Sequence, residues 1–264
     1  MDKKEKRMVA VVWIIGIVII WELLSFLLQY VLKDKMAAAK LPYPHAVLLT
    51  FFKNWKILLE AGAVTFSRAA VGFALGAGIG ILLAVIMSLS KVTERIAFPY
   101  LIVSQMIPVL GLAPIIFNIV RDMNLSRIVI AAYITFFPVS VNMLSGLKSV
   151  EQDKKDLLYS IAASKYKIYR KLMFPFSMSY LFTGMKIAAP MAVTASILVD
   201  MLGSKSGIGV KILYSLYSNS TAVFWASVVT SALMGIISYY VVVITEKVLF
   251  PWQNLSSGKG GEHA

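Results

Sequence analysis

Residues 9–32 read VAVVWIIGIVIIWELLSFLLQYVL, an apolar run in which Glu22 is the one charged side chain. A helix of about 20 apolar residues crosses the roughly 30 Å hydrocarbon core of a bilayer. The preceding MDKKEKR is similar to the charged start of a signal peptide, but the run is too long and no small-residue cleavage pattern follows it. The stretch therefore predicts a retained transmembrane helix.

The composition of the whole chain points the same way. Of its 264 residues 59% are hydrophobic and 15% are charged, whereas a soluble domain is about half apolar and a quarter charged. Cysteine is absent, and the two histidines, His45 and His263, are far apart. This excludes thiol nucleophiles, thiolate metal sites and a multi-histidine metal site, and we expect no metal site. We also expect no catalytic residues, because the few charges within the apolar stretches do not form an obvious acid–base set. The net charge of +13 is typical of cytoplasmic loops in a membrane protein and does not by itself predict nucleic-acid binding.

Apolar stretches recur along the chain and predict an all-α integral membrane protein with about six transmembrane helices. Pro108 and Pro114 interrupt the third stretch, where the helix could break or re-enter the membrane. Lysine and arginine are more frequent on the segments that face inside if both termini are cytoplasmic, which favours that topology. The expected organisation is a cytoplasmic amino-terminal segment 1–8, one transmembrane domain 9–252 and a polar tail 253–264, with spans near 9–32, 65–89, 95–120, 125–147, 178–202 and 222–250.

Two further patterns predict packing rather than chemistry. His45–Glu60 has apolar residues at helical spacing, and Pro44 suits the first turn, so we expect an amphipathic helix there. Gly72, Gly76 and Gly80 recur every four residues in an apolar stretch, the pattern that allows two helices to approach closely.

The segment 148–177 is too long for a simple turn between spans. Its first part, KSVEQDKKDLLYSIAASKYKIYRKLMFP from Lys148 to Pro175, predicts a short helix, a bend of small residues at Ala162–Ser164, and a second, basic amphipathic helix that leads into the membrane. From the residues alone, this segment could dock a partner protein, bind anionic lipid headgroups, or be a solvated loop that fixes the topology.

This segment resembles the EAA loop of permease subunits of ATP-binding-cassette (ABC) importers. That pattern is Glu-Ala-Ala, three residues, Gly, a spacer, and an apolar residue followed by Pro. Aligning its end with Pro175 places Asp156 at the glutamate and Ala162 at the glycine, and two leucines replace the two alanines. The resemblance implies that the loop couples the permease to an ATPase through Asp156, Leu157, Leu158, Ile161, Ala162, Ala163, Ser164, Lys165, Tyr166 and Pro175.

The resemblance extends over roughly residues 40–252. The stretches LPYPHAVLLTF, FSRAAVGFALGAGIGILLAVIMSLS, IPVLGLAPIIF, GSKSGIGVKI and ITEKVLFPW are similar to permeases of the nitrate, sulfonate and taurine importer group. This implies a type I ABC importer permease fold and a transporter subunit, not an enzyme, in a bacterial cell membrane. It also implies a second permease subunit, expected to be an identical copy, two cytoplasmic ABC ATPase subunits and an external solute-binding protein. The solute would be a nitrate-, sulfonate- or taurine-like anion or a small vitamin precursor.

The ATP chemistry is expected on another chain. The sequence has no Gly-x-x-x-x-Gly-Lys-Ser/Thr loop to hold phosphates. We therefore expect ATP and magnesium on the partner ATPase subunits and no cofactor on this chain.

Polar residues within the spans are candidates for the translocation path, because they are costly in a membrane unless they face protein or water. For one of them, Asp200, a substrate or gating role and a structural ion pair are both open. The alternative to an importer permease is a different class of protein, a membrane-embedded channel or enzyme whose basic inner loop binds only lipid. The candidate path residues are Gln105, Asn118, Thr194, Ser196 and Asp200.

Overall fold

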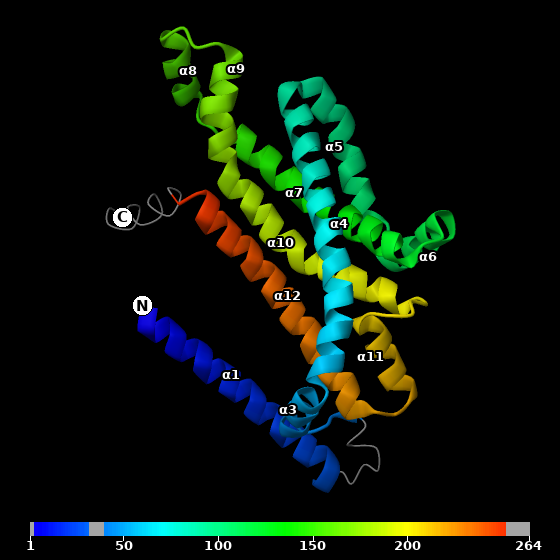
Figure 1. Ribbon diagram of the computed structural model, residues 1–264. Coiled ribbons are helices and arrows are strands. Elements are labelled where there is room, and N and C mark those ends of the chain that lie inside the picture. The colour runs from blue at the N-terminus through cyan, green and yellow to red at the C-terminus, as the bar shows by residue number, and fades with distance from the viewer. Residues whose placement is uncertain (1–2, 32–39, 252–264) are drawn as a thin grey trace.

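The computed structural model describes residues 3–31 and 40–251, which form a bundle of helices (Figure 1). Within these ranges five helices are long and apolar enough to cross a membrane, or six if a sharply bent pair counts as one span. The polar tail predicted at 253–264 lies outside the described residues. The elements are α1 (Lys3–Phe26), η1 (Leu27–Val31), α3 (Pro44–Lys53), α4 (Trp55–Leu89), α5 (Lys91–Met106), α6 (Val109–Val120), α7 (Met123–Lys148), α8 (Gln152–Ser160), α9 (Lys165–Ile168), η2 (Tyr169–Met173), α10 (Phe174–Met201), α11 (Ile208–Tyr217) and α12 (Thr221–Leu249).

The third predicted span is two helices. α5 ends at Met106, α6 begins at Val109, and their axes differ by 98°. Ile107 has extended backbone angles, as expected of a residue before a proline, and so does Pro108. Pro114, the other proline of this stretch, lies within α6 and does not end it. One of the two expected breaks is therefore present.

The amphipathic helix predicted over 45–60 is wrong in its extent. α3 begins at Pro44, as expected, but ends at Lys53, and α4 starts at Trp55, ten residues before the expected second span. Asn54 between them is non-helical, and its side-chain Nδ2 donates to the Thr50 carbonyl at 2.9 Å. Such a local side-chain bond competes with continuation of the helix.

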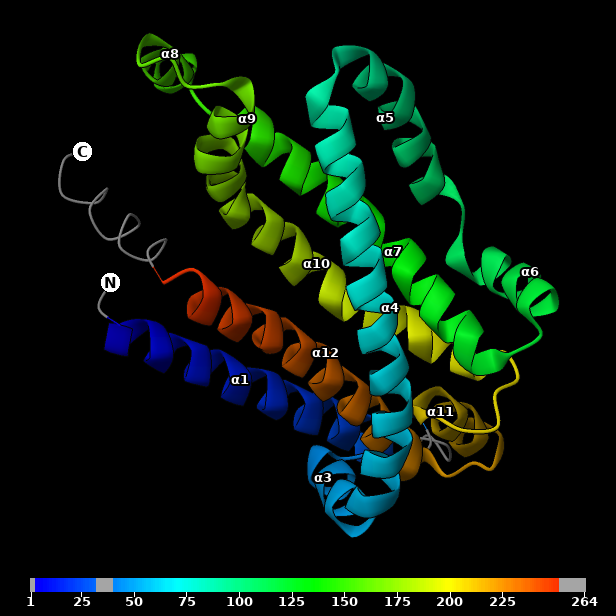
Figure 2. The ribbon, with the colours of Figure 1, turned by 45° about the horizontal axis from the view of Figure 1, so that its top comes forward.

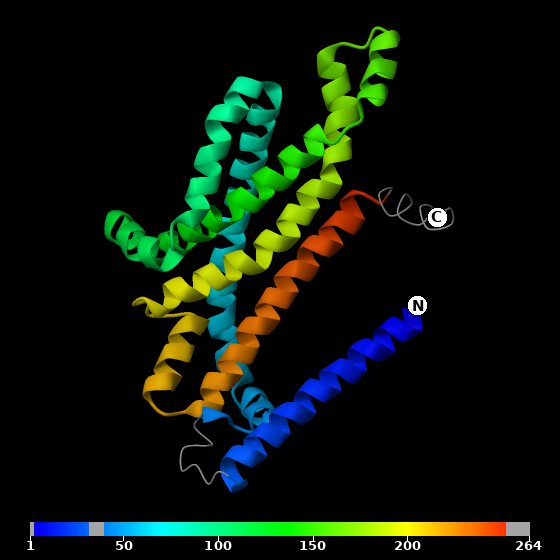
Figure 3. The ribbon, with the colours of Figure 1, turned by 180° about the vertical axis from the view of Figure 1, so that it is seen from behind.

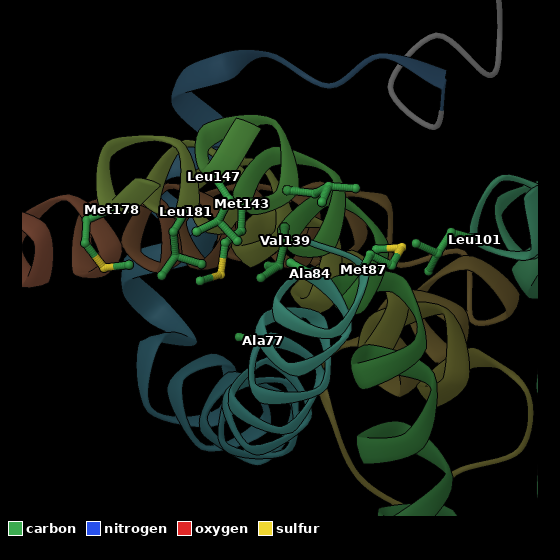
Figure 4. Packing of buried hydrophobic residues seen from close by; sticks show 11 residues of the cluster. Ala77, Ala84, Met87, Leu101, Val139, Met143, Leu147, Met178 and Leu181 are labelled. Carbon is green, nitrogen blue, oxygen red and sulfur yellow. The ribbon is translucent and has the colours of Figure 1, made fainter. Parts of the chain in front are cut away.

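The centre of the bundle is formed by α4, α7 and α10. The three glycines of the repeat, Gly72, Gly76 and Gly80 of α4, face α7, and a Cβ added at Gly76 would lie 2.4 Å from the Ala132 carbonyl oxygen. This confirms that the glycine repeat serves close packing. At the contact the buried side chains form one apolar cluster (Figure 4), which includes Ala77, Ala84, Met87, Leu101, Val139, Met143, Leu147, Met178 and Leu181.

The first helix contacts the bundle near its carboxyl end. Trp21 donates from Nε1 to the Pro42 carbonyl at 3.0 Å and its ring lies 5.2 Å from that of Trp225. Glu22, the charge predicted inside the first span, contacts His45 of α3 at 3.0 Å. Figures 1 and 3 show the rest of α1 lying apart from α12. Figures 2 and 3 place α8, α9 and the α4–α5 turn toward the end of the bundle that the start of α1 and the end of α12 also approach.

Candidate functional site

The segment predicted to couple to an ATPase protrudes from one end of the bundle as two short helices joined by a turn (Figure 1). The Ala162 N–H donates to the Tyr159 carbonyl at 2.9 Å, and the Ala163 N–H donates to the Leu158 carbonyl at 3.0 Å. This pair of bonds is the Schellman arrangement that ends many helices. Ser164 then begins α9, because its side-chain oxygen accepts from the Lys167 N–H at 3.3 Å. The predicted helix, bend and second helix are therefore present.

Ala162 has φ of +57°, in the left-handed region. In a Schellman turn the residue at this position is usually glycine, because a Cβ makes the left-handed conformation costly. The resemblance placed Ala162 where the importer pattern has glycine. The turn geometry thus gives a physical reason for glycine there, and an alanine fits at some cost in strain.

The predicted coupling residues fall into two groups. Leu157 is 67% exposed, Ile161 is 68% exposed and Tyr166 is 70% exposed, so large apolar surfaces face outward on the protruding helices. Asp156, Ala162, Ser164 and Lys165 are also exposed, and Asp156 accepts a bond from Gln152 at 2.8 Å. Leu158 and Pro175 are half-buried and Ala163 is buried against the rest of the chain.

The protruding helices are firmly attached to the bundle. Ile168 is fully buried, and the Tyr169 hydroxyl lies 3.0 Å from the Ser88 hydroxyl of α4. The Lys154 ammonium lies 5.7 Å from the centre of the Phe176 ring. Residues Lys165–Met201 form one continuous helical stretch, from the exposed loop through the bundle. The second helix of the loop is therefore continuous with α10.

The five candidate path residues differ in their exposure. Asn118 and Thr194 are exposed, and Thr194 donates to the Pro190 carbonyl within its own helix at 3.1 Å. Ser196 is fully buried, two residues from Thr194 and so on another face of α10. Its hydroxyl and the Nε2 of Gln105, at the end of α5, have no hydrogen-bond partner among the described residues. A shared path for these residues remains a prediction.

Asp200 lies in a buried polar cluster with an arginine that was not predicted as a site residue. Asp200 and Arg127 are each 1% exposed, and Asp200 Oδ1 lies 2.5 Å from Arg127 Nε. These two atoms do not meet hydrogen-bond geometry, so the contact between them is ionic. The other carboxylate oxygen accepts from the Thr65 hydroxyl at 2.5 Å and from the Gly209 N–H at 3.3 Å. Both carboxylate oxygens thus contact protein groups, one through an ion pair and the other through hydrogen bonds.

The same cluster fixes the connection between α10 and α11. Arg127 also donates to the Ser204 hydroxyl and, at 2.5 Å, to the Ser206 carbonyl. Gly207 has φ of +121°, and a Cβ there would lie 2.1 Å from Asp200 Oδ2. Arg127 is the charged member of this cluster that the predicted path residues did not include. The signal that identifies it is a lone arginine within the apolar helix α7, which requires a buried partner of opposite charge.

A second ion pair joins α10 to α12. Lys186 Nζ lies 2.5 Å from Glu246, and both side chains are largely buried. The carboxylate partner on a neighbouring helix lowers the cost of placing either charge in the bundle.

The long apolar helices, the tightly packed centre and the protruding amphipathic loop together define a multi-pass membrane protein. The chain belongs to the family described as the inner membrane component of binding-protein-dependent transport systems, which matches residues 76–250. The matched region includes the protruding loop and the buried cluster's Arg127 and Asp200. The chain is thus a transport permease, as the sequence resemblance indicated.

Named relatives agree with this assignment. The formylaminopyrimidine transport permease protein ThiX of Halalkalibacterium halodurans is 31% identical over 189 residues, which cover 72% of this chain and 76% of the relative. The putative aliphatic sulfonates transport permease protein SsuC of Bacillus subtilis is 25% identical over 248 residues, covering 92% and 86%. A crystal structure of an amino acid ABC transporter with histidines has the same fold, with a TM-score of 0.62 at 14% identity, covering 75% of this chain and 97% of that one.

Proposed function

We propose that this chain is the transmembrane permease subunit of an ATP-driven importer. In the proposed complex two permease copies pair with two cytoplasmic ABC ATPase subunits, which hold ATP and magnesium, while this chain binds no cofactor. An external solute-binding protein delivers the solute. Both termini and residues 148–177 lie on the cytoplasmic side of a bacterial cell membrane. The arrangement that supports this topology is the placement of the loop toward the same end as the start of α1 and the end of α12 (Figure 3).

The observation that carries the proposal is the apolar surface on the protruding loop. Leu157 and Ile161 are four residues apart on neighbouring turns, and each is about two-thirds exposed beyond the bundle. Apolar side chains that no span requires and no part of the described chain covers are typical of a partner site. An amphipathic helix that inserts such residues into a groove is a common docking mode.

The proposed mechanism is alternating access driven by ATP. Closure of the ATPase subunits moves the docked α8–α9 segment. Because Lys165–Met201 is one continuous helical stretch, this motion reaches the opposite end of α10, where the Arg127–Asp200 cluster ties α10 to α7 and to the α10–α11 connection. A rigid element with two arrangements is the usual carrier of such coupling.

The proposed solute is a nitrate-, sulfonate- or taurine-like anion or a small vitamin precursor. Two of the relatives are named for transport of formylaminopyrimidine and of aliphatic sulfonates. Selectivity is assigned mainly to the external binding protein. Purifying that protein with its natural ligand and identifying the ligand by mass spectrometry would decide between an oxyanion and a pyrimidine.

The coupling proposal is tested by Ile161→Glu, which places a carboxylate on the proposed docking face without disturbing a buried contact. We expect loss of co-purifying ATPase subunits and of solute uptake, with normal membrane insertion. The matched control is Tyr217→Glu, because Tyr217 is 79% exposed at the end of α11 and should leave ATPase binding unchanged. Normal ATPase binding by the Ile161 variant would refute the proposal.

A further inference from the structure

A groove of about 570 Å³ separates the end of α4 from the α8–α9 segment. Its apolar lining comes from both elements and includes Val85 and Leu89 of α4 and Met173 of η2. The protruding loop adds Lys155 and Lys165 to the lining. At its base the Tyr169 and Ser88 hydroxyls lie 3.0 Å apart and close the gap between the two elements.

The charge in this groove has one sign. Among the described residues that line it, none is acidic. The neighbouring Lys154 differs, because it lies outside the groove and pairs with Glu151 at 3.2 Å. The two groove lysines therefore attract an anion, while the apolar lining accepts hydrocarbon. A ligand that satisfies both is amphipathic and negatively charged.

The volume of the groove is within the range of small-molecule sites. Tyrosine is common at the membrane–water interface, and basic pockets beside transmembrane helices on the cytoplasmic side bind anionic lipid headgroups. The proposed ATPase contact adjoins this groove: Lys165 and Tyr166 line it, whereas Leu157 and Ile161 do not. We propose that this groove binds one anionic phospholipid of the inner leaflet, with its phosphate between Lys155 and Lys165 and the start of an acyl chain against Val85, Leu89 and Met173.

This inference rests on the cytoplasmic placement of the loop proposed above. A bound lipid would brace the α8–α9 segment against α4, and would thereby stiffen the element through which ATPase motion enters the bundle. The sequence suggested a basic surface that attracts lipid in general, whereas the groove specifies one site with two named lysines and an apolar wall.

The test compares the double variant K155Q/K165Q with the matched control K167Q, which removes an exposed charge of the same loop that does not line the groove. Each permease is purified with its ATPase subunits and placed in nanodiscs of phosphatidylcholine with increasing phosphatidylglycerol. Phosphatidylglycerol retained per permease is then counted by native mass spectrometry. Because a lysine near an anionic headgroup contributes about a fivefold gain in affinity, we expect the double variant to bind roughly 30-fold more weakly. The control should match wild type.

A second variant tests the apolar lining independently. Leu89→Glu places a carboxylate in the groove at a position that is 69% exposed, so the fold should tolerate it, and lipid retention should fall although both lysines remain. Equal retention in all variants would overturn the proposal. Loss of the ATPase subunits from K155Q/K165Q with unchanged phosphatidylglycerol would assign the groove to the ATPase and would also overturn it. Failure of the Ile161→Glu test would count against the coupling proposal alone.

Discussion

The buried Arg127–Asp200 pair supports a quantitative prediction about stability. In the Asp200→Asn variant the guanidinium of Arg127 stays charged, because arginine does not lose its proton in proteins. It is 1% exposed, so solvent cannot replace the lost carboxylate. Breaking a buried ion pair from one side costs about 3–5 kcal/mol. For a chain of this size that corresponds to a fall of roughly 6–20 °C in melting temperature.

The melting temperature of the detergent-purified permease can be followed by tryptophan fluorescence. The matched control is Lys205→Gln, which removes an exposed charge from the same α10–α11 connection and should change stability by no more than about 0.5 kcal/mol. The double variant Arg127→Gln/Asp200→Asn should recover most of the loss, because it leaves no uncompensated charge.

Two results would refute this reasoning. One is an Asp200→Asn variant with the same melting temperature as the Lys205→Gln control, since the ion pair would then contribute nothing measurable to stability. The other is a double variant that loses as much stability as the two single variants combined, since the two side chains would then act independently.

Three other substitutions test the α4–α7 contact, the turn at Ala162 and the Lys186–Glu246 ion pair. Gly76→Ala should lower the melting temperature and reduce membrane yield, because the new Cβ would lie 2.4 Å from a backbone carbonyl of α7. In the control Gly78→Ala the new Cβ meets no atom within 4 Å, so this variant should be neutral or slightly stabilising. Equal melting temperatures of the two variants would contradict the tight contact. Ala162→Gly should stabilise the loop by roughly 0.5–1 kcal/mol, because it relieves the strain of the left-handed φ, and slower limited proteolysis of the loop would report it. Lys186→Gln should cost about 1–3 kcal/mol, because Glu246 loses its partner in a largely buried position; adding Glu246→Gln should restore most of the melting temperature, and no restoration would argue against the pair.

The sequence by itself determined the protein class and most helices. The apolar stretches near 125–147 and 222–250 are α7 and α12 almost to the residue, because the length of an apolar run is set by the thickness of the bilayer. The glycine repeat of α4 and the helix, bend and helix of the loop were also readable, since both depend on spacing within one segment. Helix boundaries set by local bonds were not, as the break at Asn54 shows.

Tertiary structure alone decided which polar groups meet. The sequence left open whether Asp200 faces a solute path or forms an ion pair. Asp200 and Arg127 are 73 positions apart in the sequence, but the packing of α10 against α7 brings Asp200 Oδ1 to 2.5 Å from Arg127 Nε. Lys186 finds Glu246 in the same way. The groove beside Lys155 and Lys165 exists only because the loop folds back toward the end of α4. A charged residue in an apolar helix indicates from sequence alone that a partner is needed. Which residue is the partner depends on which helices lie side by side, and only the folded chain determines that.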